Sequence, residues 1–204
     1  MFKFRFLNVI LSVITIFSTS AYADARSQLQ DIFKGYTSLK ADFRSTVYSK
    51  KGETISTSTG VLSLKKPSSF MLHTKEPDEQ VLFTKGKDVY FYDPLIEQVS
   101  IYNIDDLYTS PFMLITSQSE SLWGRYKISL NNDTYVLIPN NPKDELKRIE
   151  LTFEKGILSG LGITFKNDNV NRYTFTSQSQ QVQNSDLEYK IPSDVEINDE
   201  RSSN

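Results

Sequence analysis

The stretch VYFYDPLIEQVSIY, residues 89–102, decides the fold that this sequence predicts. Its first four residues run without a polar break. A β-strand sends alternate side chains to opposite faces, so Val89 and Phe91 point one way and Tyr90 and Tyr92 the other. The chain as a whole is fairly polar, with a mean hydropathy of −0.39. The stretch therefore indicates a strand whose two faces both need a cover.

Similar short strand patterns, separated by turn residues, extend from this stretch in both directions. Lys85-Gly86-Lys87 joins it to the preceding strand, Gln80 to Thr84, as a hairpin. Counted along the chain, the pattern gives roughly ten to twelve short, regularly spaced strands. Such a series is typical of an antiparallel barrel or a strongly curved sheet, so we expect a mainly β protein.

Helical signals occur at two places. Near the N-terminus, apolar residues recur at spacings of three and four, and Ser27 with Gln30 resembles a capping box. These apolar residues are Leu29, Ile32, Phe33, Tyr36, Leu39 and Phe43. In the middle of the β pattern, Ser110 and Pro111 form a helix start, followed by an apolar block from Phe112 to Ile115. This block is placed where a helical lid over a sheet is expected.

The first 23 residues have the pattern of a secretory signal peptide. Lys3 and Arg5 precede a short apolar run, and Ala21-Tyr22-Ala23 is an A-x-A cleavage site. The alternative is an N-terminal membrane anchor, but the run is short for a bilayer span. We expect cleavage after Ala23, export to a bacterial periplasm, and a single domain over residues 24–204.

Composition bounds the function further. The chain has no cysteine, which excludes disulfides and an acylated N-terminal cysteine. Without Lys3 and Arg5, 21 basic residues (23 − 2) face 25 acidic ones, a net charge of about −4. No lysine or arginine block gives an electrostatic footprint for nucleic acid. We therefore expect a soluble exported protein that acts as a monomer and binds no nucleic acid.

Motifs for catalysis or metal binding are missing from the sequence. His73 is the single histidine, so a Cys/His dyad or a Cys/His metal site is impossible. The sequence has no G-x-S-x-G elbow, P-loop or dinucleotide fingerprint. We expect no enzyme activity, no cofactor and no metal site, and we interpret His73 as an ordinary strand residue.

Apolar surface is what the sequence offers instead. A curved sheet with an apolar concave face, closed by the block from Phe112 to Ile115, would enclose a cavity suited to lipid. The candidate lining residues of this cavity are Phe70, Met71, Phe91, Val99, Ile101 and Trp123. The candidate lid residues are Pro111, Phe112, Met113, Leu114 and Ile115. For the strand at Val89, we expect one face beneath the N-terminal helix and the other at the cavity. Periodicity leaves open whether Tyr90 or Phe91 faces the cavity, and we favour Phe91, because tyrosine hydroxyls prefer a wet edge. Val99 and Ile101 are expected to continue the wall of Phe91.

Five segments, in this order along the chain, resemble the outer-membrane lipoprotein carrier proteins, the LolA family. They are KKPSSF (65–70), PDEQV (77–81), VYFYDPLIEQ (89–98), SPFMLI (110–115) and VEINDER (195–201). The resemblance covers essentially the whole chain after the signal peptide. It implies an unclosed antiparallel β-barrel with helices forming a lid over a hydrophobic cavity.

The resemblance also implies a task and partners. Such carriers receive acylated lipoproteins from an inner-membrane, ATP-driven ABC-type release complex. They carry them through the periplasm to an outer-membrane receptor, itself a lipoprotein. The rival interpretations are a periplasmic lipid- or glycolipid-binding or sensor module on the same half-barrel, and a hydrolase, which would need His73 or a carboxylate pair in the cavity.

One position departs from the family pattern. Lys66 stands where the family usually has an arginine that hydrogen-bonds backbone carbonyls of the lid. Lysine keeps the charge but offers a flexible point donor in place of a planar fork. By resemblance, we expect Lys66 to be the lid latch, with Lys65 as the alternative donor, and Phe70 to lie near the cavity mouth.

Overall fold

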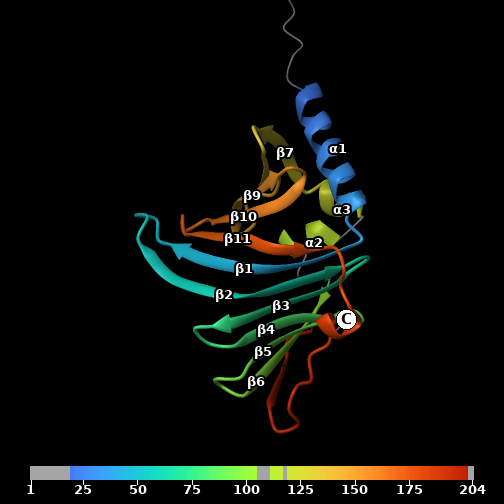
Figure 1. Cartoon of the computed structure of the whole chain (residues 1–204). Coiled ribbons are helices and arrows are strands. Elements are labelled where there is room, and N and C mark those ends of the chain that lie inside the picture. Colours follow the sequence, from blue (N-terminus) through green and yellow to red (C-terminus); the bar gives the residue numbers. More distant parts are fainter. Residues whose placement is uncertain (1–18, 105–110, 117–118, 202–204) are drawn as a thin grey trace, which may run out of the picture.

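The computed structural model describes residues 19–104, 111–116 and 119–201 and contains a single twelve-stranded sheet with short helices (Figure 1). The first six strands are β1 (Ser38–Tyr48), β2 (Thr54–Lys65), β3 (Ser69–Glu76), β4 (Gln80–Lys85), β5 (Asp88–Asp93) and β6 (Gln98–Asn103). The other six are β7 (Tyr126–Asn131), β8 (Thr134–Pro139), β9 (Leu146–Glu154), β10 (Ile157–Phe165), β11 (Val170–Ser179) and β12 (Glu196–Asp199). The helical elements are α1 (Thr19–Gly35), α2 (Pro111–Thr116), α3 (Glu120–Trp123) and the 3-10 helix η2 (Asn184–Leu187).

Strand order explains the shape of the sheet. The order is β12-β6-β5-β4-β3-β2-β1-β11-β10-β9-β8-β7, so β12 and β7 are the two edges and the barrel is not closed. Every neighbouring pair is antiparallel except β12, which runs parallel to β6. The predicted mainly β, unclosed antiparallel barrel with an N-terminal helix is confirmed.

The N-terminal helix has different ends from those predicted. It runs from Thr19 to Gly35, so it begins on the N-terminal side of the predicted cleavage position and Ser27 lies inside it. The Ser27 capping box is therefore wrong. Leu39 and Phe43 belong to β1, where they alternate with polar residues and pair with β2 and β11. Spacings of three and four joined two elements here because a strand with period two followed the helix almost directly.

The main core lies on the concave face of the sheet. It brings together α1, α2 and α3 with inward side chains from strands on both halves of the sheet. Figure 1 shows α2 within the curve of the sheet and α1 across one end. Glycine is required at position 60, where β2 passes β3 so closely that a Cβ would lie 2.0 Å from the carbonyl oxygen of His73.

The two faces of β5 have different covers. Val89 is fully buried in the main core, and Phe91 lies on the same concave face and is half-buried. Tyr90 and Tyr92 face the convex side, where the C-terminal segment covers them. The expectation that the N-terminal helix covers the second face of β5 is wrong, because the C-terminal segment occupies that place.

Candidate functional site

The helix α2 fills the concave face of the sheet. Phe112, Met113, Leu114 and Ile115 are between 0% and 5% exposed and belong to the main core. The ring of Phe112 meets the ring of Tyr173 on β11 edge-on, with 5.6 Å between their centroids. Pro111 and Thr116 are buried as well, while Ser110, the predicted cap, lies outside the described residues. The apolar block is thus a plug seated in the sheet.

Little space is left under the end of this plug. The crevice bordered by Ile115 and Thr116 of α2 and by Leu39 and Leu64 of the sheet has a volume of about 10 Å³. That volume holds at most about one water molecule. A ligand on this part of the concave face must therefore take the place of α2.

Polar contacts do not hold α2 to the sheet. The hydrogen bond from its Thr116 hydroxyl goes to the carbonyl of Met113 in the same helix, at 3.4 Å. Across the described residues, no hydrogen bond or ion pair joins α2 to another element. The helix is held by apolar packing, which an equally apolar ligand can replace.

The helices α1 and α3 form the end wall of the site. Trp123 of α3 is 2% exposed, and its ring centroid lies 6.0 Å from that of Phe33 in α1. Arg26 pairs with the carboxylate of Glu120 at 2.7 Å, and Gln30 donates to the same carboxylate at 2.9 Å. In contrast to α2, the helices α1 and α3 are joined to each other by exposed polar bonds between their side chains.

The hydrogen bond of Lys66 reaches α1, and within the described part of the chain none joins it to α2, although it borders the crevice beside Ile115 and Thr116. Its ammonium group donates a hydrogen bond to the carbonyl of Phe33 in the last turn of α1. A cation at a helix C-terminus interacts favourably with the carbonyls left free there. Burial lowers the pKa of Lys66 below its ordinary value. The alternative donor Lys65 bonds instead to Asn184 of η2, at 2.9 Å.

The six candidate lining residues lie on both faces of the sheet. Phe70 and Trp123 lie in the main core, and Phe91 shares their concave side. Three others lie on the convex face: Met71, Val99 and Ile101. The register explains this, because Val99 pairs with Tyr92 and Ile101 with Tyr90. The prediction that Val99 and Ile101 continue the wall of Phe91 is therefore wrong.

A C-terminal strap, residues 184–199, covers the convex side. Its apolar side chains pack against β3 to β6. These side chains are Leu187, Tyr189, Ile191 and Val195. Between the strap and β4 and β5 lies an open cavity of about 790 Å³ lined by Phe83 and Tyr90. Sequence reasoning missed the strap, although the alternation of Leu187, Tyr189 and Ile191 was a period-two signal for a segment lying on a sheet.

Polar bonds fasten this strap at both ends. Lys40 pairs with Asp186 at 2.6 Å, β12 pairs with β6, and Arg201 pairs with Asp88 at 3.1 Å. The hydroxyl of Tyr189 also donates to Glu79 at 3.3 Å. The strap therefore resembles a permanent part of the sheet, whereas α2 does not.

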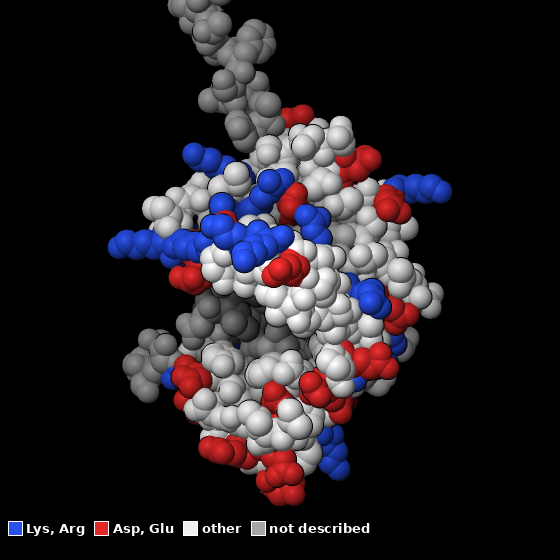
Figure 2. Space-filling view, turned by 90° about the vertical axis from the view of Figure 1, so that its left-hand side faces the viewer, with Lys and Arg blue, Asp and Glu red and all other residues white. Residues whose placement is uncertain are grey.

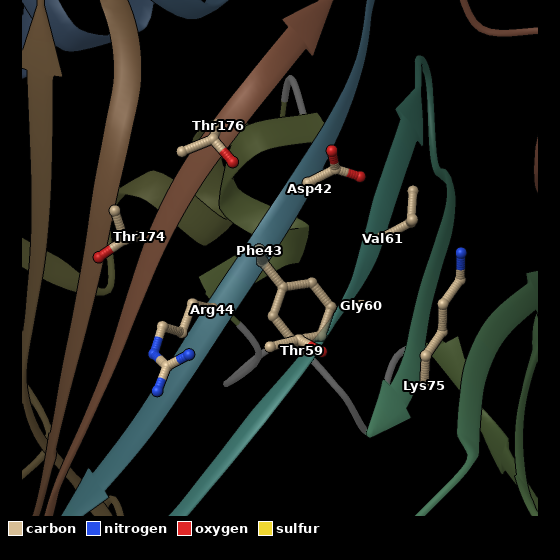
Figure 3. Close-up of a pocket in the computed structure, with 9 residues that line it drawn as sticks. All are labelled: Asp42, Phe43, Arg44, Thr59, Gly60, Val61, Lys75, Thr174 and Thr176. Atoms are coloured by element: carbon tan, nitrogen blue, oxygen red, sulfur yellow. The ribbon is translucent and has the colours of Figure 1, made fainter. Parts of the chain in front are cut away.

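A second depression lies on the outside of β11, β1 and β2. Its volume is about 560 Å³, and it carries mixed charges (Figure 3). Its lining residues include Asp42, Arg44, Lys75, Thr174 and Thr176. Figure 2, viewed from the side of the β1–β2 turn, shows a hollow with lysine and arginine gathered above it and acidic side chains below.

Chemistry other than apolar binding has little support in this geometry. Among residues 19–104, 111–116 and 119–201, no three His, Cys, Asp or Glu side chains are grouped to hold a metal ion. His73 lies on the convex side, where its Nε2 is 2.8 Å from Glu79 and its ring meets Tyr189. None of the described helices is long and apolar enough to cross a membrane.

Fold and site together define a class of protein. It is an unclosed β-barrel whose apolar concave face is plugged by a short helix, and among the described residues no hydrogen bond or ion pair joins this helix to the sheet. The comparison with protein families assigns it more narrowly: residues 34–192 match the family of the outer membrane lipoprotein carrier protein LolA. The chain belongs to this family, and the resemblance found in the sequence is confirmed.

Two similar proteins carry the name of the same family. The chain is 33% identical to the outer-membrane lipoprotein carrier protein of Actinobacillus pleuropneumoniae, over 89% of this chain and 88% of that protein. It is 32% identical to the protein of the same name from Haemophilus influenzae, over 90% of this chain and 91% of that protein.

Solved structures share the fold. A LolA superfamily protein from Nitrosomonas europaea aligns with a TM-score of 0.51 at 10% identity, over 83% of this chain and 98% of that one. An uncharacterized protein from Thermus thermophilus aligns with a TM-score of 0.50 at 11% identity, over 84% and 99%. At such identities the likeness concerns the fold alone.

Proposed function

We propose that this protein carries acylated lipoproteins through the periplasm and holds their acyl chains on the concave face of its sheet. It takes its cargo from an inner-membrane ABC-type release complex and delivers it to an outer-membrane receptor lipoprotein. The protein works as a monomer after cleavage of residues 1–23, and it needs no catalytic step or cofactor. The observation that carries this proposal is α2, an apolar plug for which the described residues show no polar bond to the sheet.

The energetics explain why such a carrier is needed. Each CH₂ group of an acyl chain costs about 0.8 kcal/mol to move from a membrane into water. Three chains of about fifteen carbons would place tens of kcal/mol in the way of spontaneous transfer. A protein that covers the chains removes most of this barrier, but it must also release them at the receptor.

The cargo can be released because α2 competes with the acyl chains for the same surface of the sheet. Burial of a large apolar side chain contributes about 1.5–3 kcal/mol, so the four residues from Phe112 to Ile115 contribute roughly 6–12 kcal/mol to the closed state. Cargo binding must displace this contact, and cargo leaving restores it. The two states bury comparable apolar surface, which keeps the equilibrium near balance and lets the receptor pull the cargo away.

The test is to isolate the protein from the periplasm and weigh it intact by native mass spectrometry. The expected masses are those of a chain beginning at Asp24, alone and with one intact lipoprotein bound. Cross-linking before lysis guards against loss of cargo. Complexes with phospholipid or glycolipid only would contradict the carrier function and favour the lipid-binding or sensor interpretation.

Activity with mutant protein tests the site itself. Leu72 and Leu82 lie on the concave side against the main core, whereas Phe83 lies beneath the strap. Leu82→Gln should reduce the amount of lipoprotein released from inner-membrane vesicles, because it places a polar group on the acyl surface. Phe83→Leu, on the opposite face of the same strand, is the matched control and should leave release unchanged. Equal release by both variants would contradict the concave face as the cargo site.

A further inference from the structure

The concave face is not apolar along its whole length. On β1 the inward residues change from Leu39, Ala41 and Phe43 near α1 to Ser45 toward the β1–β2 turn. On the neighbouring strand β11, Asn171 and Tyr173 lie on the same face beside Ser45. Ser45 is 2% exposed, although it is polar. A buried polar group in such a place needs partners.

These three side chains are bonded to one another. The Ser45 hydroxyl donates to the Asn171 amide oxygen at 2.6 Å, and the Asn171 amide nitrogen donates to the Tyr173 hydroxyl at 3.2 Å. Serine and tyrosine each carry one donor hydrogen and asparagine carries two. The two bonds use two of these four hydrogens, and a third bond joins Tyr173 to Ser45. The second hydrogen of Asn171 remains for an acceptor on a ligand, and the Tyr173 hydroxyl can reach the same acceptor by giving up its bond with Ser45.

The lid lies directly against this cluster. Phe112 of α2 covers the ring of Tyr173 edge-on at 5.6 Å, and Phe43 meets the same ring at 5.6 Å. When α2 leaves the concave face, the contact with Phe112 is lost and the ring of Tyr173 becomes available to the incoming ligand. The apolar residues near α1 and the polar cluster then form one continuous surface, with the half-buried Val47 opposite Asn171 at its outer edge.

We propose that Ser45, Asn171 and Tyr173 form a polar subsite that binds the ester carbonyl oxygens of the diacylglyceryl group at the head of a lipoprotein's acyl chains. The inference rests on the proposed carrier function and places the chains in it: their methyl ends point toward α1 and their linkages lie at the cluster. The peptide part of the cargo then leaves the sheet at the end of the β1–β2 turn.

Hydrogen-bond chemistry supports this assignment. Ester carbonyls accept hydrogen bonds but cannot donate them, and burying one without a donor costs about 1–3 kcal/mol. The cluster offers donors and carries no charge. Burial raises the pKa of the Tyr173 hydroxyl above its ordinary value, while hydrogen bonds with Asn171 and Ser45 act in the opposite direction. The hydroxyl therefore keeps its proton at neutral pH.

The experiment compares two synthetic lipopeptides. Both carry three acyl chains on an N-terminal cysteine, but one has two ester linkages and the other has ethers at the same positions. Affinities are measured by titration of the purified mature protein. Tyr173→Phe should weaken binding of the ester probe about three- to tenfold, the effect of one lost hydrogen bond, and should leave binding of the ether probe unchanged.

Two further variants keep the test independent of folding. Ser45→Ala should shift the ester-to-ether ratio in the same direction, and it serves if Tyr173→Phe does not fold. Tyr90→Phe removes a tyrosine hydroxyl from the convex face and should change neither affinity. Equal losses with both probes, or no loss with either, would overturn the subsite. If the wild type does not bind the ester probe at all, the proposed function itself fails.

Discussion

The sheet of this protein is apolar on both faces along β3 to β6, and the two faces have different kinds of cover. On the concave side lies α2, whose side chains are all buried and which has no polar bond to another described element. On the convex side lies the C-terminal strap, fastened by strand pairing and by ion pairs at both of its ends. A cover held by apolar packing alone can be exchanged for lipid, whereas a cover with many polar bonds must lose them all to leave. The difference between the two covers indicates that the concave face, beneath α2, is the surface that binds the ligand.

The largest expected effect is a difference in the free energy of unfolding between two variants that introduce a buried charge, one beneath the strap and one in α2. Val81 and Leu114 are both 0% exposed, one on the convex side and one in α2. We expect Val81→Asp to lower the free energy of unfolding by about 4 kcal/mol or more, because the charge cannot reach water. Leu114→Asp should cost less than half of this and raise the binding of an apolar dye, because the helix can swing out. Urea unfolding measures both.

The control for this pair is the strand signal in circular dichroism, which Leu114→Asp should retain. The cost of the variant is limited by the net free energy of lid closure, because the helix can leave the sheet and expose the charge to water. Equal losses of stability for the two variants would mean that α2 is as permanent as the strap.

A weakened lid should bind cargo more tightly. Phe112→Ala removes the contact with Tyr173 and up to about 3 kcal/mol of packing from the closed state. We expect the affinity for a triacylated lipopeptide to rise, by up to about 100-fold. Phe83→Ala, a truncation of equal size beneath the strap, should give no such gain. An affinity of Phe112→Ala equal to or below that of the wild type would show that the lid does not compete with cargo.

Loss of the Lys66 bond should have a smaller effect and should spare the lid. Lys66→Gln removes an ammonium group from the carbonyl of Phe33, so we expect a loss of stability of about 1 kcal/mol, seen by urea unfolding. Affinity for the lipopeptide should stay within about twofold of the wild type. A gain like that expected of Phe112→Ala would support the predicted role of Lys66 as lid latch.

A fall in pH should destabilise the contacts of the strap with the sheet and leave those of α2 unchanged. The hydrogen bond from Lys40 holds the pKa of Asp186 below its ordinary value of 3.8, and the bond from Arg201 lowers that of Asp199 to about 2. A lowered pKa in the folded state means stability that is present above pH 3.8 and lost as the pH falls toward about 2. The sequence of α2, PFMLIT, contains no ionisable side chain.

Hydrogen exchange measures this difference. After correction for intrinsic rates, amides of residues 184–199 should lose protection as the pH falls from about 4 to about 2, and those of residues 111–116 should not. Asp186→Asn should already show the weaker protection at pH 5. Parallel loss in both segments would contradict a strap that depends on ion pairs.

The sequence predicted the strands and the apolar helical block well, because these depend on local patterns, whereas the unclosed form of the sheet was predicted from the family resemblance. Turn residues such as Lys85-Gly86-Lys87 mark strand ends, and the block from Phe112 to Ile115 is conspicuous in any polar chain. The sequence did not predict reliably to which face of the sheet side chains point after a turn. Asp93-Pro94 leads to a register in which Val99 opposes Tyr92, and only the pairing of β5 with β6 decides that Val99 lies on the convex side.

Long-range contacts were the other limit. The strap lies about a hundred residues from β4 and β5 in the chain, and no local signal indicates which face it covers. The same holds for Lys66, whose partner Phe33 is separated from it by 33 residues. Ser45 and Asn171 are polar residues in strand patterns, and only the pairing of β1 with β11 brings them together.

The most direct test of the account is the reactivity of one thiol under each cover. The chain has no cysteine, so Leu114→Cys and Val81→Cys each give a unique label site. Maleimide labelling of both purified variants is followed with and without a saturating triacylated lipopeptide. We predict that cargo raises the labelling rate of Leu114→Cys about tenfold or more and leaves that of Val81→Cys unchanged. If Leu114→Cys stays as protected when loaded as when empty, while the lipopeptide is bound, the lid is not displaced by cargo and the central claim is wrong.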